Sequence, residues 1–252
     1  MQFYQDTFLI FIRHFQRNLR NPAWVVIGLT QPILYLAFFG PIAIKLPMLR
    51  TMGANPWQIY IPGLLVQLGL FGSSFVGFGI IADWRAGIIE RMRVTPISRL
   101  AMLLGRVLVD VCVLTVQAIV LICASFFFGL RAPLPGIAAS LVFVMLLGMS
   151  LASLSYATGL IMKSEDAFAP LLSSISVPVM LLSGVLLPIS IGPPWLKKIA
   201  VFNPFYHIVE AMRLVFAGEY LRLQVLAGVV VAVAMAAISL TVGTRVFRRE
   251  NT

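Results

Sequence analysis

Six long apolar runs, separated by shorter polar segments, dominate the pattern of the chain. They cover residues 24–44, 60–81, 107–130, 136–162, 167–187 and 225–242. A helix needs about 20 apolar residues to cross the hydrocarbon core of a membrane, and most of these runs reach that length, although the sixth is marginal without its flanks. The runs lack the period-two alternation of a membrane β-barrel. The pattern therefore predicts an all-α membrane protein with six transmembrane helices.

The first 20 residues precede these runs and are amphipathic. The apolar residues that share one helical face are Phe3 or Tyr4, Phe8, Phe11, Ile12, Phe15 and Leu19. Such a pattern predicts a helix that lies in the membrane interface. The arginines follow the apolar residues, whereas in a secretory signal peptide the positive charge comes first. We assign residues 1–22 to this interfacial helix, 23–244 to the six-helix transmembrane domain and 245–252 to a tail.

A charged segment, residues 82–100, joins the second and third runs. Its apolar positions recur at a spacing of three and four residues and are Ile88, Ile89 and Met92. This spacing favours a short helix that lies flat on the aqueous surface. Gly87 loosens the start of the segment, and Pro96 ends it because the residue before a proline avoids the α conformation. The alternative is a basic loop that only fixes membrane orientation, and the pattern favours neither.

The segment between the fifth and sixth runs, residues 188–223, is too apolar for a free loop and too interrupted for a crossing. Asn203 is a suitable helix cap, and Pro204 suits the first position of the helix that follows. We predict two short re-entrant helices that enter the outer half of the membrane, with a plain surface amphipathic helix as the alternative. The residues that define the segment are Pro188, Trp195, Asn203, Pro204, Glu210 and Arg213.

Composition agrees with a membrane protein and excludes an ordinary soluble domain. The 252 residues are 60% hydrophobic and only 11% charged, with a mean hydropathy of +0.97, whereas soluble domains carry about 25% charged residues. The net charge of +10 is dispersed among the apolar runs instead of forming one dense stripe. Membrane orientation explains this charge better than nucleic-acid binding, which we exclude.

The basic residues also predict the orientation of the chain. An even number of spans puts both termini on one side, together with Arg13, Arg17, Arg20, Arg85, Arg91, Arg93, Arg99, Arg106, Lys163, Arg245, Arg248 and Arg249. The opposite side carries Lys45, Arg50, Arg131, Lys197, Lys198, Arg213 and Arg222. Because cytoplasmic loops carry the excess of lysine and arginine, we predict that both termini are cytoplasmic in a multi-pass protein of the cell membrane.

Small and charged residues within the runs suggest contacts between helices. Gly69, Ser73 and Gly77 stand four residues apart, which gives the second span a face for close packing at a subunit or bundle interface. Asp110 lies inside the third run, one turn after Arg106, so a snorkelling ion pair between the two is favoured over a proton relay.

The two cysteines do not indicate a disulfide or a metal site. Cys112 and Cys123 are eleven helical residues apart, about 16 Å along the axis, which is far beyond the roughly 7 Å that a disulfide allows. We interpret both as small packing or lipid-facing residues.

Three motifs together resemble those of a known family. They are Asp83, Gly87, Glu90, Thr95, Pro96, Ser98 and Arg99 after the second run, the break at residues 188–195, and Asn203-Pro204 followed by Glu210-Ala211-Met212-Arg213. In this order the chain resembles the permease subunits of type-2 ATP-binding-cassette (ABC) exporters, closest to the daunorubicin-resistance branch. The likeness extends over nearly the whole chain.

The resemblance implies an exporter of two permease subunits, identical or homologous, and two cytoplasmic ABC ATPase subunits that bind ATP and Mg. It also implies that residues 82–100 form the coupling helix, with apolar groups buried in the ATPase and arginines at its acidic rim. The coupling residues are Asp83, Arg85, Gly87, Ile88, Ile89, Glu90, Arg91, Met92, Arg93, Thr95 and Pro96. The stretch Trp84-Arg85-Ala86 departs from the more usual charged run of the family, which leaves the individual salt bridges open.

The sequence contains no motif that indicates nucleotide binding, catalysis or metal binding by this chain. It has no Gly-x-x-x-x-Gly-Lys-Ser/Thr stretch, so nucleotide must be bound by another polypeptide. Only His14 and His207 are available as histidines, and no cluster suits a metal, so we expect no enzyme activity, cofactor or metal in this chain. An ion-coupled secondary transporter remains an alternative, although neither internal repeats nor midplane ion-coupling groups are evident.

The expected cargo is a hydrophobic or amphipathic small molecule such as a drug, an antibiotic or a lipid-like compound. Its route is expected along the interface of two permeases, lined by the first, second and fifth spans, in contact with membrane lipids. The residues expected to line it are Tyr35, Phe38, Phe39, Gln67, Phe71, Phe75, Pro178 and Met180. Core packing is the alternative for each of them, and export of a polysaccharide or glycolipid is the alternative within the family.

Overall fold

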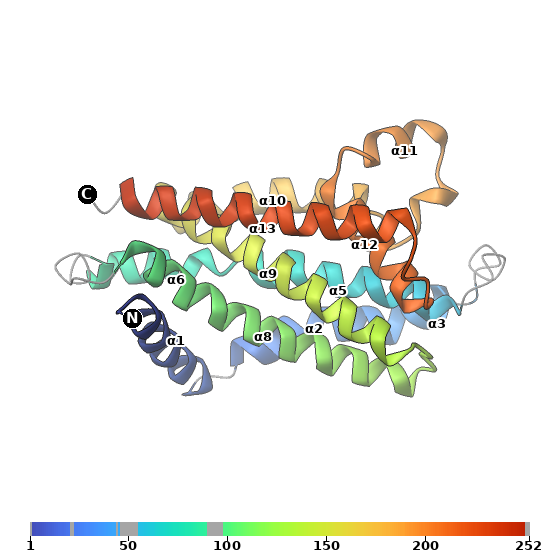
Figure 1. Cartoon of the computed structure of the whole chain (residues 1–252), viewed down its shortest axis with the longest axis horizontal. Coiled ribbons are helices and arrows are strands. Elements are labelled where there is room, and N and C mark those ends of the chain that lie inside the picture. The colour runs from blue at the N-terminus through green and yellow to red at the C-terminus, as the bar shows by residue number, and fades with distance from the viewer. Residues whose placement is uncertain (1, 21–22, 44, 46–54, 90–97, 250–252) are drawn as a thin grey trace.

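The computed structural model describes residues 2–20, 23–43, 45, 55–89 and 98–249, and Figure 1 shows them as a bundle of helices. All regular elements of these residues are helical, which confirms the all-α fold. In chain order they are α1 (Gln2–Arg20), α2 (Ala23–Leu34), the π-helix η1 (Tyr35–Phe39), α3 (Gly40–Ala43), α5 (Pro56–Ser74), α6 (Gly77–Arg85), α8 (Arg99–Phe127), α9 (Leu134–Met162), α10 (Glu165–Leu182), the 3-10 helix η2 (Ile189–Ile191), α11 (Pro194–Ala200), α12 (Pro204–Phe216) and α13 (Leu223–Arg249).

Six helical stretches of the described chain are long and apolar enough to cross a membrane. They are Val25–Ala43, Pro56–Arg85, Leu100–Phe127, Leu134–Met162, Glu165–Leu182 and Leu223–Arg249. The prediction of six spans is therefore confirmed. The sixth is not marginal, because its helix continues through basic residues to Arg249.

Local capping signals determine where several helices begin. The Ser98 hydroxyl accepts a hydrogen bond from the backbone N–H of Ala101 and so caps α8. Asn203 caps α12 with Pro204 at its first position, as the sequence predicts. Two acidic residues, Glu165 and Asp166, occupy the first turn of α10, where they complement the helix dipole.

Helix α9 forms the centre of the bundle and contacts α5, α6, α8, α12 and α13 (Figure 1). Small residues on α9 permit this close packing. Gly148 lies against Leu114 of α8, and the Ser150 hydroxyl is 2.9 Å from the Ser239 hydroxyl on α13. Small side chains and interhelical hydrogen bonds are what hold helices together in lipid, where no hydrophobic force drives one helix onto another.

The second span is broken, whereas the sequence predicts one continuous helix there. α5 ends at Ser74 and α6 begins at Gly77. At the break the Ser155 hydroxyl of α9 accepts from the Gly77 N–H (2.8 Å) and donates to the Ser74 carbonyl (2.5 Å). A side chain of another helix thus satisfies backbone groups that a continuous helix would pair internally.

The small face of the second span belongs to the interior of this chain. Gly69 lies beside Leu147, and Gly77 lies against the Ser155 backbone of α9. Ser73, between them, is buried. Of the two interfaces that the sequence left open, the structure shows the one within the bundle.

Alanine substitutions at two glycines of α6 should have opposite effects. A Cβ at Gly77 would lie 2.5 Å from the Ser155 carbonyl oxygen, whereas a Cβ at Gly79 has nothing within 4 Å. Gly77→Ala should therefore cost about 1–3 kcal/mol through overpacking. The matched control Gly79→Ala should be neutral or stabilising, because alanine favours the helix by about 1 kcal/mol. Thermal unfolding in detergent measures both, and equal effects would contradict the close approach.

Candidate functional site

One candidate site lies at the end of the bundle where α1 and α6 meet the start of α8, which we call the α1 end (Figure 1). Helix α1 packs against α8 there, with Ile10 buried against the backbone of Gly105. The opposite edge of α1 leaves Tyr4, Phe8 and Leu9 exposed. Helix α1 thus has one apolar edge that packs against the bundle and another that remains exposed on the surface of the chain.

Three charged residues from three helices meet at this end. Asp83 of α6 is 3% exposed, and its two carboxylate oxygens accept from different arginines. Arg17 of α1 donates to Oδ1 at 3.1 Å, and Arg106 of α8 donates to Oδ2 at 2.7 Å. We call this group the Asp83 cluster. Through these contacts α6 holds both α1 and α8 by charge.

The Asp83 cluster corrects two interpretations of the sequence. Arg106 pairs with Asp83 and not with Asp110, so the predicted snorkelling pair is wrong. Asp110 instead accepts a hydrogen bond from the Tyr156 hydroxyl of α9 at 2.5 Å. Asp83, which the sequence predicts at the contact with the ATPase, is buried in this structure and forms ion pairs with arginines of α1 and α8.

The residues after Asp83 tie the end of α6 to its neighbours. Arg85 pairs with Glu165 at 3.1 Å, but both side chains are exposed, so the pair contributes little to stability. The Nζ atom of Lys163 lies over the Trp84 ring, 5.7 Å from its centroid. Together these contacts hold the end of α6 against the turn between α9 and α10.

The coupling residues that follow have different surroundings. Gly87 has a φ of +67°, which favours glycine, and its N–H donates to the Trp84 carbonyl. Ile88 is half-buried beside Ile10. Ile89 is buried in the core with Leu103, so in this structure it does not present the surface to the ATPase that the sequence predicts. The remaining predicted coupling residues lie outside the described residues and are Glu90, Arg91, Met92, Arg93, Thr95 and Pro96.

A second cluster lies at the opposite end, around α12. Arg213 is buried, and its guanidinium donates to the Ile59 carbonyl (3.0 Å), the Gly184 carbonyl (2.6 Å) and Glu210 Oε1 (2.7 Å). Asn203 also donates to the Val179 carbonyl at 2.8 Å. These bonds fasten α12 to the start of α5 and the end of α10.

The sequence places Glu210 and Arg213 on one side of α12 but does not predict that Arg213 is buried. Pro188 precedes η2, and Trp195 on α11 is exposed. Helices α11 and α12 meet at an angle of 101°. A broken span or a re-entrant loop would both give this bend.

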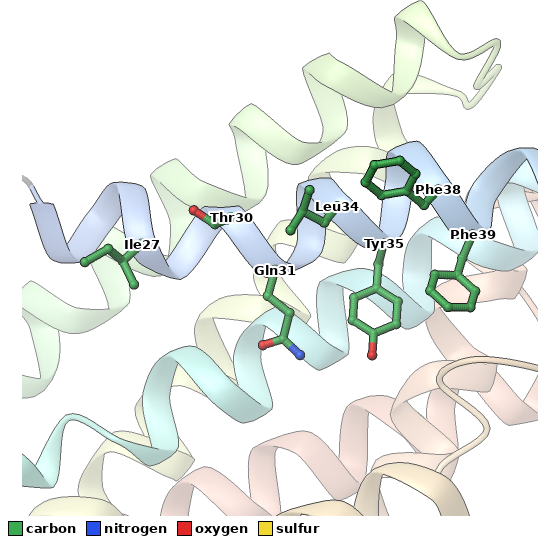
Figure 2. A pocket seen from close by; sticks show the side chains of 7 residues that line it. All are labelled: Ile27, Thr30, Gln31, Leu34, Tyr35, Phe38 and Phe39. Atoms are coloured by element: carbon green, nitrogen blue, oxygen red, sulfur yellow. The ribbon is translucent and has the colours of Figure 1, made fainter.

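An open pocket runs along α2 and η1 and has a volume of about 550 Å³ (Figure 2). Its lining residues are Ile27, Thr30, Gln31, Leu34, Tyr35, Phe38 and Phe39. Figure 2 shows Gln31, Tyr35 and Phe39 projecting from the same side of the helix. Most of this surface is exposed, and Phe38 is 66% exposed. An apolar wall with two polar residues suits an amphipathic molecule.

The backbone under this pocket is unusual. Residues Tyr35–Phe39 form a π-helix shortly after Pro32, and the Tyr60 hydroxyl of α5 donates to the Tyr35 carbonyl at 3.1 Å. π-helical turns arise where the regular hydrogen-bond ladder is disturbed and are frequent at functional sites. On the other side, Gln117 of α8 donates to the Val25 carbonyl and holds the start of α2.

Only part of the predicted cargo path comes together. Tyr35, Phe38 and Phe39 line the pocket, but Gln67, Phe71, Phe75, Pro178 and Met180 do not. Gln67 is 1% exposed and lies within the core of the bundle, away from the open pocket. The pocket residues that the sequence analysis missed are Ile27, Thr30, Gln31 and Leu34. The polar pair Thr30-Gln31 within an apolar run was the available signal.

The aromatic residues of the second span have a structural role at its break. Phe75 stacks on Phe71 and on Phe78, with ring centroids 6.4 Å and 6.1 Å away. Phe78 in turn meets the buried Phe168 of α10 edge to face at 5.0 Å. This row of rings continues across the break between α5 and α6, where the regular helical hydrogen bonds of the backbone are interrupted.

The described residues contain no group of three or more histidine, cysteine, aspartate or glutamate side chains that could hold a metal. Cys112 is partly buried, and Cys123 is exposed, and both are free thiols, as the sequence predicts.

Taken together, the apolar helical bundle and its two end clusters define a multi-pass membrane protein. The chain belongs to the ABC-2 type transporter family, whose model matches residues 5–217. The match begins within α1 and extends through the first five spans to α12. It therefore includes both the α1 end and the α12 end of the bundle. The resemblance found in the sequence motifs is thereby confirmed. Membership of this family implies that the chain works with an ATPase subunit.

Several named proteins are similar to this chain. One is ycf38 of Cyanophora paradoxa, described as a candidate transport permease, which is 25% identical over 85% of this chain and 75% of its own length. The daunorubicin resistance ABC transporter permease DrrB1 of Streptomyces coeruleorubidus is 22% identical over 77% of this chain and 69% of its own. DrrC of Mycobacterium tuberculosis, a candidate doxorubicin resistance permease, is 22% identical over 84% and 76%.

Proposed function

We propose that the chain is the membrane-spanning subunit of an ATP-driven exporter that moves a hydrophobic or amphipathic small molecule out of the cytoplasm. The observation that carries the choice of cargo is the exposed aromatic pocket on α2 and η1 (Figure 2). The names of two relatives, which refer to resistance to daunorubicin and doxorubicin, support the same class of cargo. Both of these compounds have flat apolar rings joined to a polar group.

The proposed assembly contains two copies of the ATPase subunit and a second permease, identical or homologous. ATP and Mg bind to the ATPase, which agrees with the absence of a phosphate-binding loop from this sequence. The assembly lies in the cell membrane with both chain termini in the cytoplasm. The excess of basic residues on that side supports this orientation.

The proposed mechanism uses the α1 end as the point where force enters. Closure of the two ATPases on ATP displaces the coupling segment, residues 82–100. Because Asp83 binds arginines of α1 and α8, these helices move with α6. Ile89 packs in the same core cluster as Phe247 of α13, which gives the last span a contact with the segment.

The α12 end is proposed to act as the outer, fixed part of the permease. Helices α11 and α12 enter the outer half of the membrane and return, which the 101° bend between them supports. The three bonds that the Arg213 guanidinium makes to Ile59, Gly184 and Glu210 hold α12 in place. A re-entrant backbone is tolerated only where protein shelters it, and these contacts provide that shelter.

Reconstitution tests the proposal directly. The chain should co-purify with an ATPase encoded beside it, and inverted vesicles containing both should accumulate daunorubicin when ATP and Mg are added. Daunorubicin should also stimulate ATP hydrolysis. If the chain alone moved the drug on an ion gradient, without the ATPase, the proposed function would be wrong and a secondary transporter would replace it.

Removing an exposed ring from the pocket should weaken drug transport. Phe38→Ala removes a large apolar contact surface, and the loss of about 1.4 kcal/mol of binding should lower transport efficiency about tenfold. Phe126→Ala on α8 is the matched control, because Phe126 is also an exposed phenylalanine but does not line the pocket. Uptake of daunorubicin by inverted vesicles measures both. Equal losses in the two variants would remove the pocket from the cargo path.

A further inference from the structure

A second, smaller cavity of about 130 Å³ lies at the α1 end, between α1, α6 and α8. Its lining residues are Arg13, His14, Arg17, Asp83, Ile88 and Arg106. Four of these six are charged, which is unusual for a chain with only 11% charged residues. The cavity has room for a small group, since one water molecule occupies about 30 Å³ in the liquid.

The charges of this cavity do not balance. Three guanidinium groups face one carboxylate, and Asp83 is the only acidic residue that lines the cavity among the described residues. Asp83 engages one terminal nitrogen of Arg17 and one of Arg106, whereas each guanidinium has five N–H donors. Arg13 adds a third set of donors on the same side of α1, one turn before Arg17. Donors and positive charge therefore exceed the acceptors that the cavity supplies.

His14 does not add to this positive charge. Burial, together with the neighbouring charge of Arg106, lowers the pKa of His14 to about 4. The ring is therefore neutral at physiological pH and does not add to the repulsion. A neutral imidazole can donate one further hydrogen bond to a bound group.

The place of the cavity on the molecule suggests where a ligand would come from. Helix α1 has exposed apolar residues, including Phe8 and Leu19, that suit insertion among lipid chains. Arg13 and Arg17 lie on the same helix and are themselves exposed. The amphipathic pattern of α1 predicts that this helix lies in the membrane interface, and this position would bring the cavity to the depth where lipid headgroups meet water.

We propose that this cavity binds an oxyanion of the phosphate type, held by Arg13, Arg17 and Arg106 beside His14. Guanidinium groups match the oxygens of phosphate with two parallel hydrogen bonds, and Arg106 is already fixed in place by Asp83. The phosphate belongs either to an anionic lipid headgroup or to a free ion. Its binding adds a contact between α1 and α8, independently of which cargo the protein moves.

Ligand-dependent thermal stability tests this site. The full chain in dodecylmaltoside micelles is titrated with short-chain phosphatidylglycerol, with phosphatidylcholine of the same chain length, or with inorganic phosphate at constant ionic strength. A ligand that binds only the folded state raises the melting temperature as its concentration passes the dissociation constant. Arg13→Gln should shift the half-maximal concentration about tenfold higher, because one charged pair of hydrogen bonds is lost.

The control is Arg20→Gln, which removes the same charge from the same helix at a residue that does not line the cavity. Stabilisation by phosphatidylglycerol alone, weakened by Arg13→Gln and not by Arg20→Gln, supports a lipid headgroup. Stabilisation by inorganic phosphate with the same pattern supports a free ion. Equal weakening in both variants indicates only surface attraction and overturns the site. Absence of stabilisation by both phosphatidylglycerol and inorganic phosphate overturns it as well, and so does equal stabilisation by phosphatidylglycerol and the zwitterionic phosphatidylcholine.

Discussion

Replacing Asp83 by alanine is expected to lower the melting temperature of the purified chain by about 10 °C. The substitution leaves the buried guanidinium of Arg106, 5% exposed, without its carboxylate. Breaking a buried pair in this way costs about 3–5 kcal/mol. In a chain of about 250 residues, each kcal/mol lowers the melting temperature by about 2–4 °C. Unfolding followed by tryptophan fluorescence in detergent measures the change.

The matched control is Arg17→Gln, which removes the other partner of the same carboxylate. The Arg17 side chain is 64% exposed, and exposed pairs contribute at most about 1 kcal/mol, so its variant should melt within about 4 °C of the parent. The double variant Asp83→Ala with Arg106→Ala should recover part of the loss, since it leaves no buried charge. If Asp83→Ala and Arg17→Gln were equally damaging, the pair with Arg106 would not be the important one.

Replacing Gly87 by proline should abolish drug-stimulated ATP hydrolysis and transport, while the protein remains in the membrane. The φ of Gly87 is +67°, and proline is fixed near −65°, so the chain must leave α6 in another direction. The proline also removes the N–H that donates to the Trp84 carbonyl. The segment proposed to engage the ATPase would then be misdirected. Vesicle transport and co-purification with the ATPase measure the effect.

Gly218→Pro provides the matched control at the other end of the bundle. Gly218 also has a positive φ, +85°, and its N–H likewise donates to the carbonyl three residues earlier, that of Val215. The local disturbance is therefore similar, but Gly218 lies far from α6 in the fold. If Gly218→Pro stopped co-purification with the ATPase as completely as Gly87→Pro, the coupling role of residues 82–100 would have no support.

The fold could be predicted from the sequence because a membrane simplifies the problem. Apolar length alone indicates a spanning helix, and the six runs are long enough for the signal to be clear. Caps such as Asn203 act through neighbouring residues and are equally evident. By contrast, the break after Ser74 depends on the Ser155 hydroxyl of another helix. A contact between residues 81 positions apart leaves no trace in local periodicity.

The candidate site was harder to predict for a related reason. The spacing of Ile88 and Ile89 predicts one apolar face, but the structure separates the two side chains. Ile88 packs beside Ile10 of α1, whereas Ile89 packs in the core with Leu103 of α8. Arg106 and Asp110 are neighbours on one helix, yet each finds its partner on another. Helical periodicity indicates which residues share a face. It does not indicate which neighbouring helix covers that face.

Gln67 has a further consequence for how the bundle can open. Both polar atoms of its amide are buried without a hydrogen-bond partner in the described part of the chain, as is the Ser140 hydroxyl of α9. Leaving such groups dry costs about 1–3 kcal/mol each. Water admitted beside them would recover part of that energy, whereas other buried polar groups, such as the Ser150 and Ser155 hydroxyls, already have hydrogen-bond partners. Hydration of the bundle interior is therefore most favourable beside Gln67 of α5 and Ser140 of α9.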